Sequence, residues 1–285
     1  MFSFVEYLMR KDKQMGPIGV FDSGFGGLTV LKEIQKQLPN YDFIYLGDNA
    51  RAPYGSRSFE TVYEYTLQCV NHLFEKGCHL VILACNTASA KALRTIQQKD
   101  LPKIAPRKRV LGVIRPTTET IGNYTTTKQV GILGTEGTIS SGSYLVEIQK
   151  FFPDIQVFQQ ACPMLVPLIE HQEFDNAGAD FFIKKYINSL LSQSNKIDAI
   201  ILGCTHYPII EQKIKQHVPN NIQLISQGKI VAKSLADYLQ RHQEIDANCS
   251  KQGTTTFLTT DLTANFDKAA ELFFGTKVNS ERLEL

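Results

Sequence analysis

Short apolar runs alternate with amphipathic helical stretches along this chain, and this alternation limits the folds that it can adopt. Residues 17–21 form the first apolar run, and residues 28–38 follow it with Leu28, Leu31 and Ile34 on one helical stripe. Further runs of strand length occur at 42–47, 79–84, 109–114, 129–133, 155–159 and 198–203. Runs that are apolar throughout are typical of parallel strands buried on both faces. The pattern therefore predicts an α/β fold with mainly parallel sheets.

Part of this pattern occurs twice. Residues 18–24 resemble residues 130–136 at an offset of 112, and residues 82–87 resemble residues 201–206 at an offset of 119. Two segments shifted by nearly the same amount indicate an internal duplication. Two prolines and a basic cluster interrupt the pattern at residues 101–110, where we place the boundary between the two units.

The charges of the chain are balanced. Its 285 residues include 30 Lys and Arg and 28 Asp and Glu, which leave a net charge of +2. Such a chain has no electrostatic footprint for nucleic acid or for an anionic membrane, so we expect a small-molecule substrate. No apolar run approaches the roughly 20 residues that span a bilayer. Residues 1–16 lack the features of a signal peptide, so we expect a short N-terminal extension and a cytoplasmic protein.

Two of the six cysteines stand at the ends of apolar runs. Cys85 and Cys204 each follow a predicted buried strand, at matching positions of the apparent repeat. A lone cysteine in this setting is usually a small core residue, but the matching positions favour a chemical role. Moving a proton between the two faces of a tetrahedral carbon requires an acid and a base on opposite sides. Two thiols whose ordinary pKa is about 8.5 can act as such a pair.

The other four cysteines are read as structural, and no CxxC pair or cluster with His or Asp predicts a metal site. In a reducing cytoplasm all of them are expected to be free thiols.

A glycine-rich turn at residues 22–27 offers a carboxylate on Asp22 and a hydroxyl on Ser23. Backbone N–H groups in such a turn can receive a substrate carboxylate. Alternatively, either side chain caps the helix that follows. The turn is neither a dinucleotide-binding fingerprint nor a P-loop.

Two further polar turns are candidates for substrate contacts. Residues 50–58 include Tyr54 and Gly55, although this segment can also be an ordinary turn directed by proline. Residues 134–144 place Thr135, Thr138 and Ser141 at a helix start, either as caps or as ligands of an anion.

Six motifs in this order resemble those of glutamate racemases, the cofactor-independent enzymes that make D-glutamate for bacterial peptidoglycan. They lie between residues 18 and 208 and read GVFDSGFGGLTV, DNARAPYGSRS, ACNTASA, GILGTEGTI, CPMLVPLIE and GCTHYP. The resemblance implies two α/β domains related by a pseudo-twofold axis, with the active site between them. The expected division is residues 17–108 with 226–285 for the first domain and 109–225 for the second, after an extension over residues 1–16.

The resemblance also implies roles for individual residues. Cys85 and Cys204 would be the two acid/base residues, with Asp22 assisting the first and Glu170 and His206 assisting the second. Taken alone, His206 could be a hydrogen-bonded structural histidine and Glu170 an exposed carboxylate at a helix end. The expected substrate-binding residues are Asp22, Ser23, Tyr54, Gly55, Asn86, Thr87, Thr135, Thr138, Thr205 and His206. No cofactor and no metal are implied.

The chain departs from the family pattern at two places. Arg115 stands where many members carry an acidic residue, and Ser226-Gln227-Gly228 stands where an Asp-Ser pair is usual. These departures concern interdomain or regulatory details. Some members with N-terminal extensions depend on a cell-wall precursor as activator, and residues 1–16 allow the same here. The chain is expected to be a monomer or a homodimer.

Three other functions remain open at this point. An aspartate racemase of the same superfamily is the nearest alternative, and turnover of the two amino acids separates it from a glutamate racemase. An amino-acid binding module with two lobes is the second, although the paired thiols count against it. The third is an interaction protein acting on DNA topology, for which the balanced charge gives no support.

Overall fold

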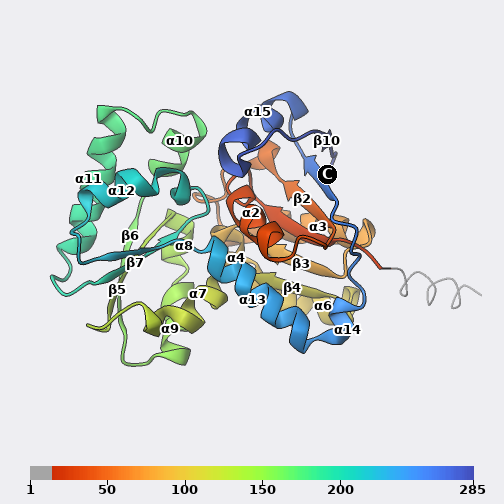
Figure 1. The fold of residues 1–285 in the computed structure, drawn as a ribbon, viewed down its shortest axis with the longest axis horizontal. Coiled ribbons are helices and arrows are strands. Elements are labelled where there is room, and N and C mark those ends of the chain that lie inside the picture. The colour runs from red at the N-terminus through yellow and green to blue at the C-terminus, as the bar shows by residue number, and fades with distance from the viewer. Residues whose placement is uncertain (1–14) are drawn as a thin grey trace, which may run out of the picture.

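Residues 15–285 are described by the computed structural model, and they form two parallel sheets flanked by helices (Figure 1). The first sheet has six strands in the order β10-β9-β2-β1-β3-β4, and each pair of neighbours is parallel. Its strands are β1 (Ile18–Asp22), β2 (Phe43–Gly47), β3 (Leu80–Leu83), β4 (Arg109–Gly112), β9 (Thr255–Thr259) and β10 (Ser280–Arg282). The predicted fold class is confirmed.

The second sheet repeats the centre of the first. It has the order β6-β5-β7-β8, with strands β5 (Gln129–Gly134), β6 (Gln156–Ala161), β7 (Ala199–Gly203) and β8 (Gln223–Ile225). In β1 and β3 Gly19 lies opposite Val81, and in β5 and β7 Gly131 lies opposite Ile200. These pairs differ by the offsets of 112 and 119 residues that the sequence shows. The repeat is therefore present in both strand order and register.

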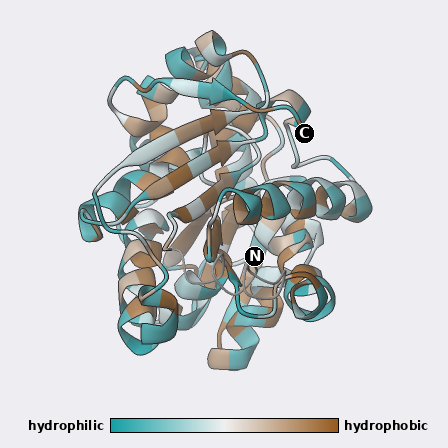
Figure 2. Ribbon diagram, turned by 90° about the vertical axis from the view of Figure 1, so that its right-hand side faces the viewer, coloured by the Kyte–Doolittle hydropathy of each residue, from teal (hydrophilic) through white to brown (hydrophobic). Residues whose placement is uncertain are grey.

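Helices cover the sheets and bury their apolar stripes against them. In Figure 2 the central strands are mostly brown, and many helices show one brown and one teal side. All residues of β1, β2, β3 and β7 are buried, as the uninterrupted apolar runs predict. The α-helices are α2 (Leu28–Gln37), α3 (Phe59–Glu75), α4 (Asn86–Lys91), α5 (Leu93–Thr95), α6 (Leu101–Ile104), α7 (Ile114–Thr120), α8 (Glu136–Ser140), α9 (Ser143–Phe151), α10 (Leu165–Glu170), α11 (Ala177–Leu191), α12 (Glu211–His217), α13 (Gly228–Arg241), α14 (Gln243–Asp246) and α15 (Thr263–Phe274).

Capping groups explain where several helices begin. The Ser58 hydroxyl accepts the Thr61 N–H at the start of α3, and the Cys85 thiol accepts the Ala88 N–H at the start of α4. Helix α4 therefore begins at residue 86, directly after Cys85. Helices α8 and α9 are separate because Gly142 between them has φ +65°.

The predicted domain boundary needs one correction. β4 begins at Arg109 and pairs with β3, so a boundary at 108/109 would cut the last strand from the first sheet. Residues 109–112 are therefore moved to the first domain. The rest of the predicted division into two domains stays a prediction. The predicted extension, residues 1–16, lies largely outside the described residues. Within them, Gly16 bridges to Cys249.

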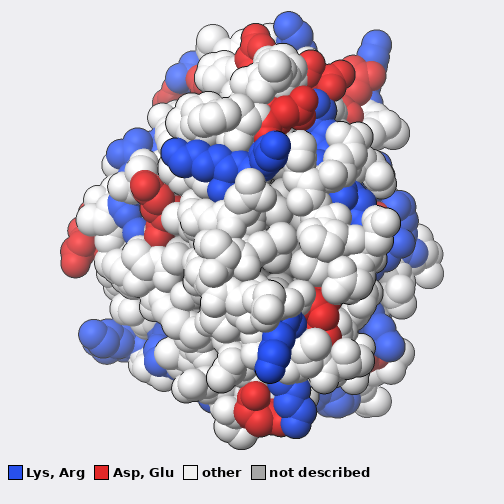
Figure 3. Space-filling view, turned by 90° about the vertical axis from the view of Figure 1, so that its left-hand side faces the viewer, with Lys and Arg blue, Asp and Glu red and all other residues white. Residues whose placement is uncertain are grey.

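The chain crosses between the sheets at two points, after β4 and after β8. The second crossing leads into α13, which packs against α2 of the first sheet, and β9 and β10 then extend that sheet. Among residues 15–285, no helix is long and apolar enough to cross a membrane. On the face in Figure 3, Lys and Arg side chains lie among Asp and Glu side chains instead of gathering into one patch.

Candidate active site

A cavity of about 170 Å³ lies where the carboxyl ends of the strands of both sheets meet. Its wall is formed by Ser23 after β1, residues 52–56 after β2, residues 85–87 after β3, Thr135 and Glu136 after β5, Pro163 after β6, residues 204–206 after β7, and Val166, Pro167 and Glu170 of α10. Sites for drug-sized ligands measure roughly 300–1,000 Å³, so this cavity suits a smaller molecule such as an amino acid.

Cys85 is held on one side of the cavity by two polar contacts. Its Sγ lies 3.5 Å from the Ser23 hydroxyl and accepts the Ala88 N–H at 3.4 Å. Burial, together with the nearby Asp22 carboxylate, raises the pKa of the Cys85 thiol to about 12 against the effect of these hydrogen bonds. The Cys85 side chain is therefore a protonated thiol at neutral pH.

Cys204 stands on the other side in a different electrostatic setting. Its Sγ lies 3.8 Å from Nδ1 of His206, whose Nε2 lies 2.8 Å from Oε1 of Glu170. Burial alone lowers the pKa of His206, but its contacts with Cys204 and Glu170 outweigh this effect and raise the pKa to about 10. His206 is therefore an imidazolium at neutral pH, and its positive charge lies beside the sulfur of Cys204.

Asp22 lies behind the cavity wall and is almost completely buried. Its Oδ1 accepts the Gly24 N–H at 2.9 Å, and the Thr205 hydroxyl donates to Oδ2 at 3.4 Å. Burial raises the pKa of Asp22, although the charge on His206 opposes this effect. The suggestion that Asp22 or Ser23 caps α2 is wrong, because the N-cap residue is Gly27, without a side-chain cap.

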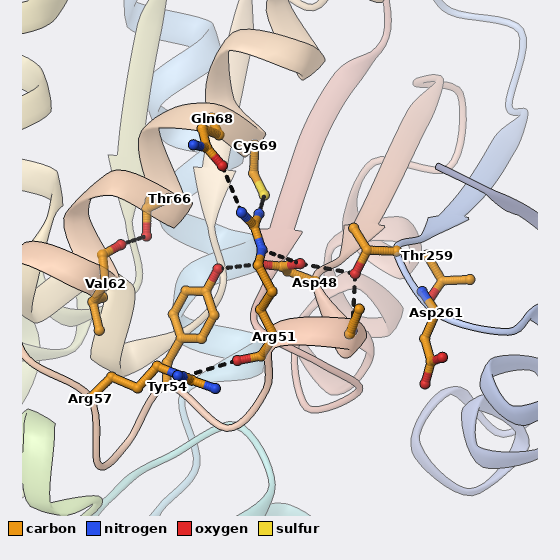
Figure 4. Close-up of polar contacts among 12 residues, drawn as sticks. Asp48, Arg51, Tyr54, Arg57, Val62, Thr66, Gln68, Cys69, Thr259 and Asp261 are labelled. Carbon is orange, nitrogen blue, oxygen red and sulfur yellow. Dashed lines mark hydrogen bonds and ion pairs between the residues drawn. The ribbon is translucent and has the colours of Figure 1, made fainter. Parts of the chain in front are cut away.

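Tyr54 forms part of the wall, and its hydroxyl donates to the buried carboxylate of Asp48 (Figure 4). Asp48 also accepts hydrogen bonds from Nε of Arg51 at 2.7 Å and from the Thr260 hydroxyl at 2.9 Å. The Arg51 guanidinium lies 4.2 Å from the centre of the Tyr65 ring. This network ties residues 50–58 to α3 and to the segment after β9, so the predicted contact residue Tyr54 is itself anchored from behind.

We expect Tyr54→Phe to lower the free energy of unfolding by about 1.5 kcal/mol, because Asp48 loses a hydrogen bond in a buried site. The KM for the substrate is expected to rise roughly fivefold because the cavity wall loosens, which corresponds to about 1 kcal/mol of binding. Urea unfolding and steady-state kinetics measure the two effects. Tyr63→Phe is the matched control, since it removes a hydrogen bond to Asp100, which is not part of the Asp48 network. An unchanged KM in Tyr54→Phe would mean that the hydrogen bond between Tyr54 and Asp48 contributes to stability but not to substrate binding.

Hydroxyl groups join the two sheets above the cavity. The Thr87 hydroxyl lies 2.9 Å from that of Thr135 and 3.4 Å from that of Thr138. Next to them the Gly137 N–H donates to the Gly55 carbonyl at 2.7 Å. Thr135 also caps α8 by accepting the Thr138 N–H, so the cap reading of this threonine is correct.

The structure brings most of the predicted site residues to one cavity. Its wall includes Cys85, Cys204, Ser23, Tyr54, Gly55, Asn86, Thr87, Thr135, Glu170, Thr205 and His206. Asp22 and Thr138 are fully buried behind it, and Ser141 lines a different cavity. Sequence reasoning missed Asp48, Tyr144 and Gln227. Each of them lies in a segment that the sequence singles out: Asp48 begins the motif DNARAPYGSRS, Tyr144 ends residues 134–144, and Gln227 is part of the departure at residues 226–228.

The geometry of this site can support proton transfer on both sides of one small molecule. The two thiols come from different sheets, and the groups between them are hydroxyls, amides and backbone. No Lys or Arg lines the cavity among the residues that the structure covers. A negatively charged ligand would therefore be held by hydrogen-bond donors and by His206.

Comparison with known proteins gives the family. The sequence model for Asp/Glu/hydantoin racemases matches residues 18–235. A glutamate racemase of Persephonella marina is 39% identical over 269 residues, which cover 94% of this chain and 97% of that protein. The crystal structure of Francisella tularensis glutamate racemase in complex with D-glutamate has a TM-score of 0.84 at 33% identity, covering 96% of this chain and 98% of that chain. Escherichia coli glutamate racemase, solved with L-glutamate and the activator UDP-MurNAc-ala, has a TM-score of 0.71 at 27% identity, covering 90% and 92%. This chain therefore belongs to the Asp/Glu/hydantoin racemase family and, within it, to the glutamate racemases.

Proposed function

We propose that the chain interconverts L-glutamate and D-glutamate by proton transfer between two thiols, Cys85 and Cys204. One observation supports this most strongly. The two cysteines follow β3 and β7, corresponding strands of the two repeats, and they line the same cavity. A racemase needs an acid and a base on opposite faces of the α-carbon, and the repeat supplies one thiol from each sheet.

In the proposed reaction the Cys204 thiolate takes the α-proton and the Cys85 thiol gives a proton to the opposite face. Cys204 is then a thiol and Cys85 a thiolate, so the product state is ready for the reverse reaction. Negative charge that develops on the substrate is stabilised by amide and hydroxyl donors on the wall, such as Asn86, Thr87 and Thr205.

The two thiols differ in their surroundings. Cys85 is protonated and lies near the Asp22 carboxylate, whereas Cys204 lies beside the imidazolium of His206. The free site is therefore set for Cys204 to act as the base and Cys85 as the acid. By analogy with the family pattern, this direction is L-glutamate to D-glutamate.

Incubation with L-glutamate in deuterated water tests the proposal. Loss of optical rotation together with deuterium at the α-carbon, followed by NMR, would support a racemase acting by proton transfer. Aspartate is tested in parallel. Turnover of aspartate but not of glutamate would show that aspartate is the substrate. Binding without exchange of the α-proton would contradict the catalytic proposal.

We propose that the product serves peptidoglycan synthesis in the cytoplasm. Six free cysteines, all buried, fit a reducing compartment. A strain that lacks the gene and requires external D-glutamate would support this role, and growth without D-glutamate would contradict it.

A cell-wall precursor is a candidate activator, as UDP-MurNAc-ala is for the Escherichia coli enzyme. A second cavity of about 670 Å³ lies beside the two chain crossings and is lined by parts of α4, α7, α9 and α13. Arg94, Arg115 and Arg241 are among its lining residues, together with Glu119 and Glu147. The departure at Arg115 thus adds positive charge to a cavity large enough for a nucleotide sugar.

Titration with UDP-MurNAc-ala while racemisation is followed tests this second proposal. An increase in turnover that Arg241→Glu weakens would support it, because the substitution puts a negative charge in the path of the diphosphate. Unchanged turnover at every concentration would contradict it.

A further inference from the structure

Three buried side chains form a closed ring of hydrogen bonds beside the active site. Nδ2 of Asn86 donates to Oε1 of Gln227 at 2.8 Å, Nε2 of Gln227 donates to the Tyr144 hydroxyl at 2.8 Å, and that hydroxyl donates to Oδ1 of Asn86 at 2.8 Å. Each residue is at most 3% exposed. The ring joins three elements: Asn86 begins α4, Tyr144 lies on α9, and Gln227 precedes α13 at a crossing between the sheets.

The direction of the ring is fixed by a neighbouring carbonyl. Nε2 of Gln227 also lies 3.1 Å from the carbonyl oxygen of Val113, which can only accept a hydrogen bond. The nitrogen of the Gln227 amide must therefore face Val113, and its oxygen must face Asn86. Asn86 then has to donate to Gln227, which leaves its oxygen to accept from Tyr144. The amide of Asn86 cannot flip without leaving a buried polar group unsatisfied.

This constraint reaches the active site through Asn86. Asn86 directly follows Cys85 and forms part of the cavity wall. Its amide has two N–H groups, and the ring uses one of them. With the oxygen accepting from Tyr144, the second N–H of Asn86 is the donor that remains for a ligand. A carboxylate accepts such a hydrogen bond, whereas an ammonium group does not.

We propose that Gln227 is a positioning residue that acts through Asn86, fixing its amide so that it donates to a carboxylate of the substrate. The inference rests on the proposed function for the identity of that substrate. Gln227 belongs to the segment in which the sequence departs from the usual Asp-Ser. Its long amide contacts Val113, Tyr144 and Asn86 together, which a single hydroxyl at this position could not do.

Kinetics of single and double variants test the proposal. Gln227→Glu keeps the shape but removes the donor, and Tyr144→Phe removes the hydroxyl that holds Asn86. Each is expected to raise the KM for glutamate about tenfold with little change in kcat, because a hydrogen bond to the bound substrate is lost in ground and transition states alike. In an Asn86→Ala background, the same substitutions are expected to change KM less than about twofold.

Tyr124→Phe is the matched control, since Tyr124 packs against the same core cluster as Tyr144 without contacting the ring. Its KM should stay that of the wild type. If Gln227→Glu or Tyr144→Phe raises KM equally in the presence and absence of Asn86, the effect does not pass through Asn86 and the proposal fails.

A second measurement does not depend on the reaction. In urea unfolding, the losses of stability in Gln227→Glu and Tyr144→Phe should be clearly non-additive, because both break one ring. Additive losses would overturn the ring itself. Failure of the wild type to racemise or bind glutamate, with coupling between the two substitutions intact, would instead overturn the proposed function and with it the role of Asn86 toward glutamate.

Discussion

Replacing either Cys85 or Cys204 with alanine is expected to reduce racemisation by about 10³-fold or more, since each substitution removes the proposed proton donor and acceptor on one face of the substrate. Both thiols are almost fully buried, at 5% and 6% exposure, so water cannot readily take over. The rate of change of optical rotation measures this loss. Turnover at the wild-type rate in either variant would contradict the two-thiol scheme.

The remaining thiol should still exchange one substrate proton. With Cys204 present and Cys85 absent, a proton can be removed from one enantiomer and replaced by deuterium on the same face, without inversion. The variant that lacks Cys204 should exchange only the opposite enantiomer. Proton NMR of each pure enantiomer in deuterated water measures both rates. Exchange of both enantiomers by one variant would mean that a single thiol reaches both faces.

Cys249→Ala is the control for loss of a buried thiol. Cys249 lies beside Gly16, and its Sγ donates to the Ile245 carbonyl, far along the sequence from both cavity thiols. This variant should lose about 1 kcal/mol of stability, because a small cavity forms, and should keep its activity. Comparison with Cys85→Ala then separates loss of chemistry from loss of packing.

The fold could be predicted because its signals are local or repeated. Uninterrupted apolar runs mark strands buried on both faces, and the same offsets that link Gly19 to Gly131 also appear in the strand register. Cys85 and Cys204 could be predicted for the same reason, since each directly follows such a run. The short edge strand β10 could not, because Ser280–Arg282 is polar and mostly exposed.

The supporting residues of the site were not predictable, because their partners are distant in the sequence. Asn86 and Gln227 are 141 residues apart, and Thr260 is 212 residues from Asp48. Pattern and propensity describe neighbours along the chain and do not report which side chains meet after the sheets assemble. The resemblance to a family implied a role for Asn86. It implied none for Gln227, because the sequence departs from the family pattern at that segment.

The pair of His206 and Glu170 leads to the second large effect. His206→Asn removes the positive charge beside Cys204, and we expect kcat to fall about 100-fold in the direction in which Cys204 is the base. Glu170→Gln keeps the shape and weakens the imidazolium, so a smaller loss is expected. L- and D-glutamate have equal free energies in water, so kcat/KM must stay equal in the two directions for every variant. A difference between the two directions must therefore appear as matched changes in kcat and KM. A measured difference in kcat/KM would reveal an error in the assay.

The pH dependence of stability gives an independent measurement of the same pair. The pKa of His206 is about 10 in the folded protein, against roughly 6.5 in an unfolded chain. The folded state therefore binds more protons between these values, so the stabilisation is complete below pH 6.5 and is lost as the pH rises to 10. The contribution of His206 to the free energy of unfolding should fall by up to about 1.4 kcal/mol per pH unit in this window, and it is measured as the difference in slope between the wild type and His206→Asn. The same slope in both proteins would mean that His206 is neutral in the folded state and places no positive charge beside Cys204.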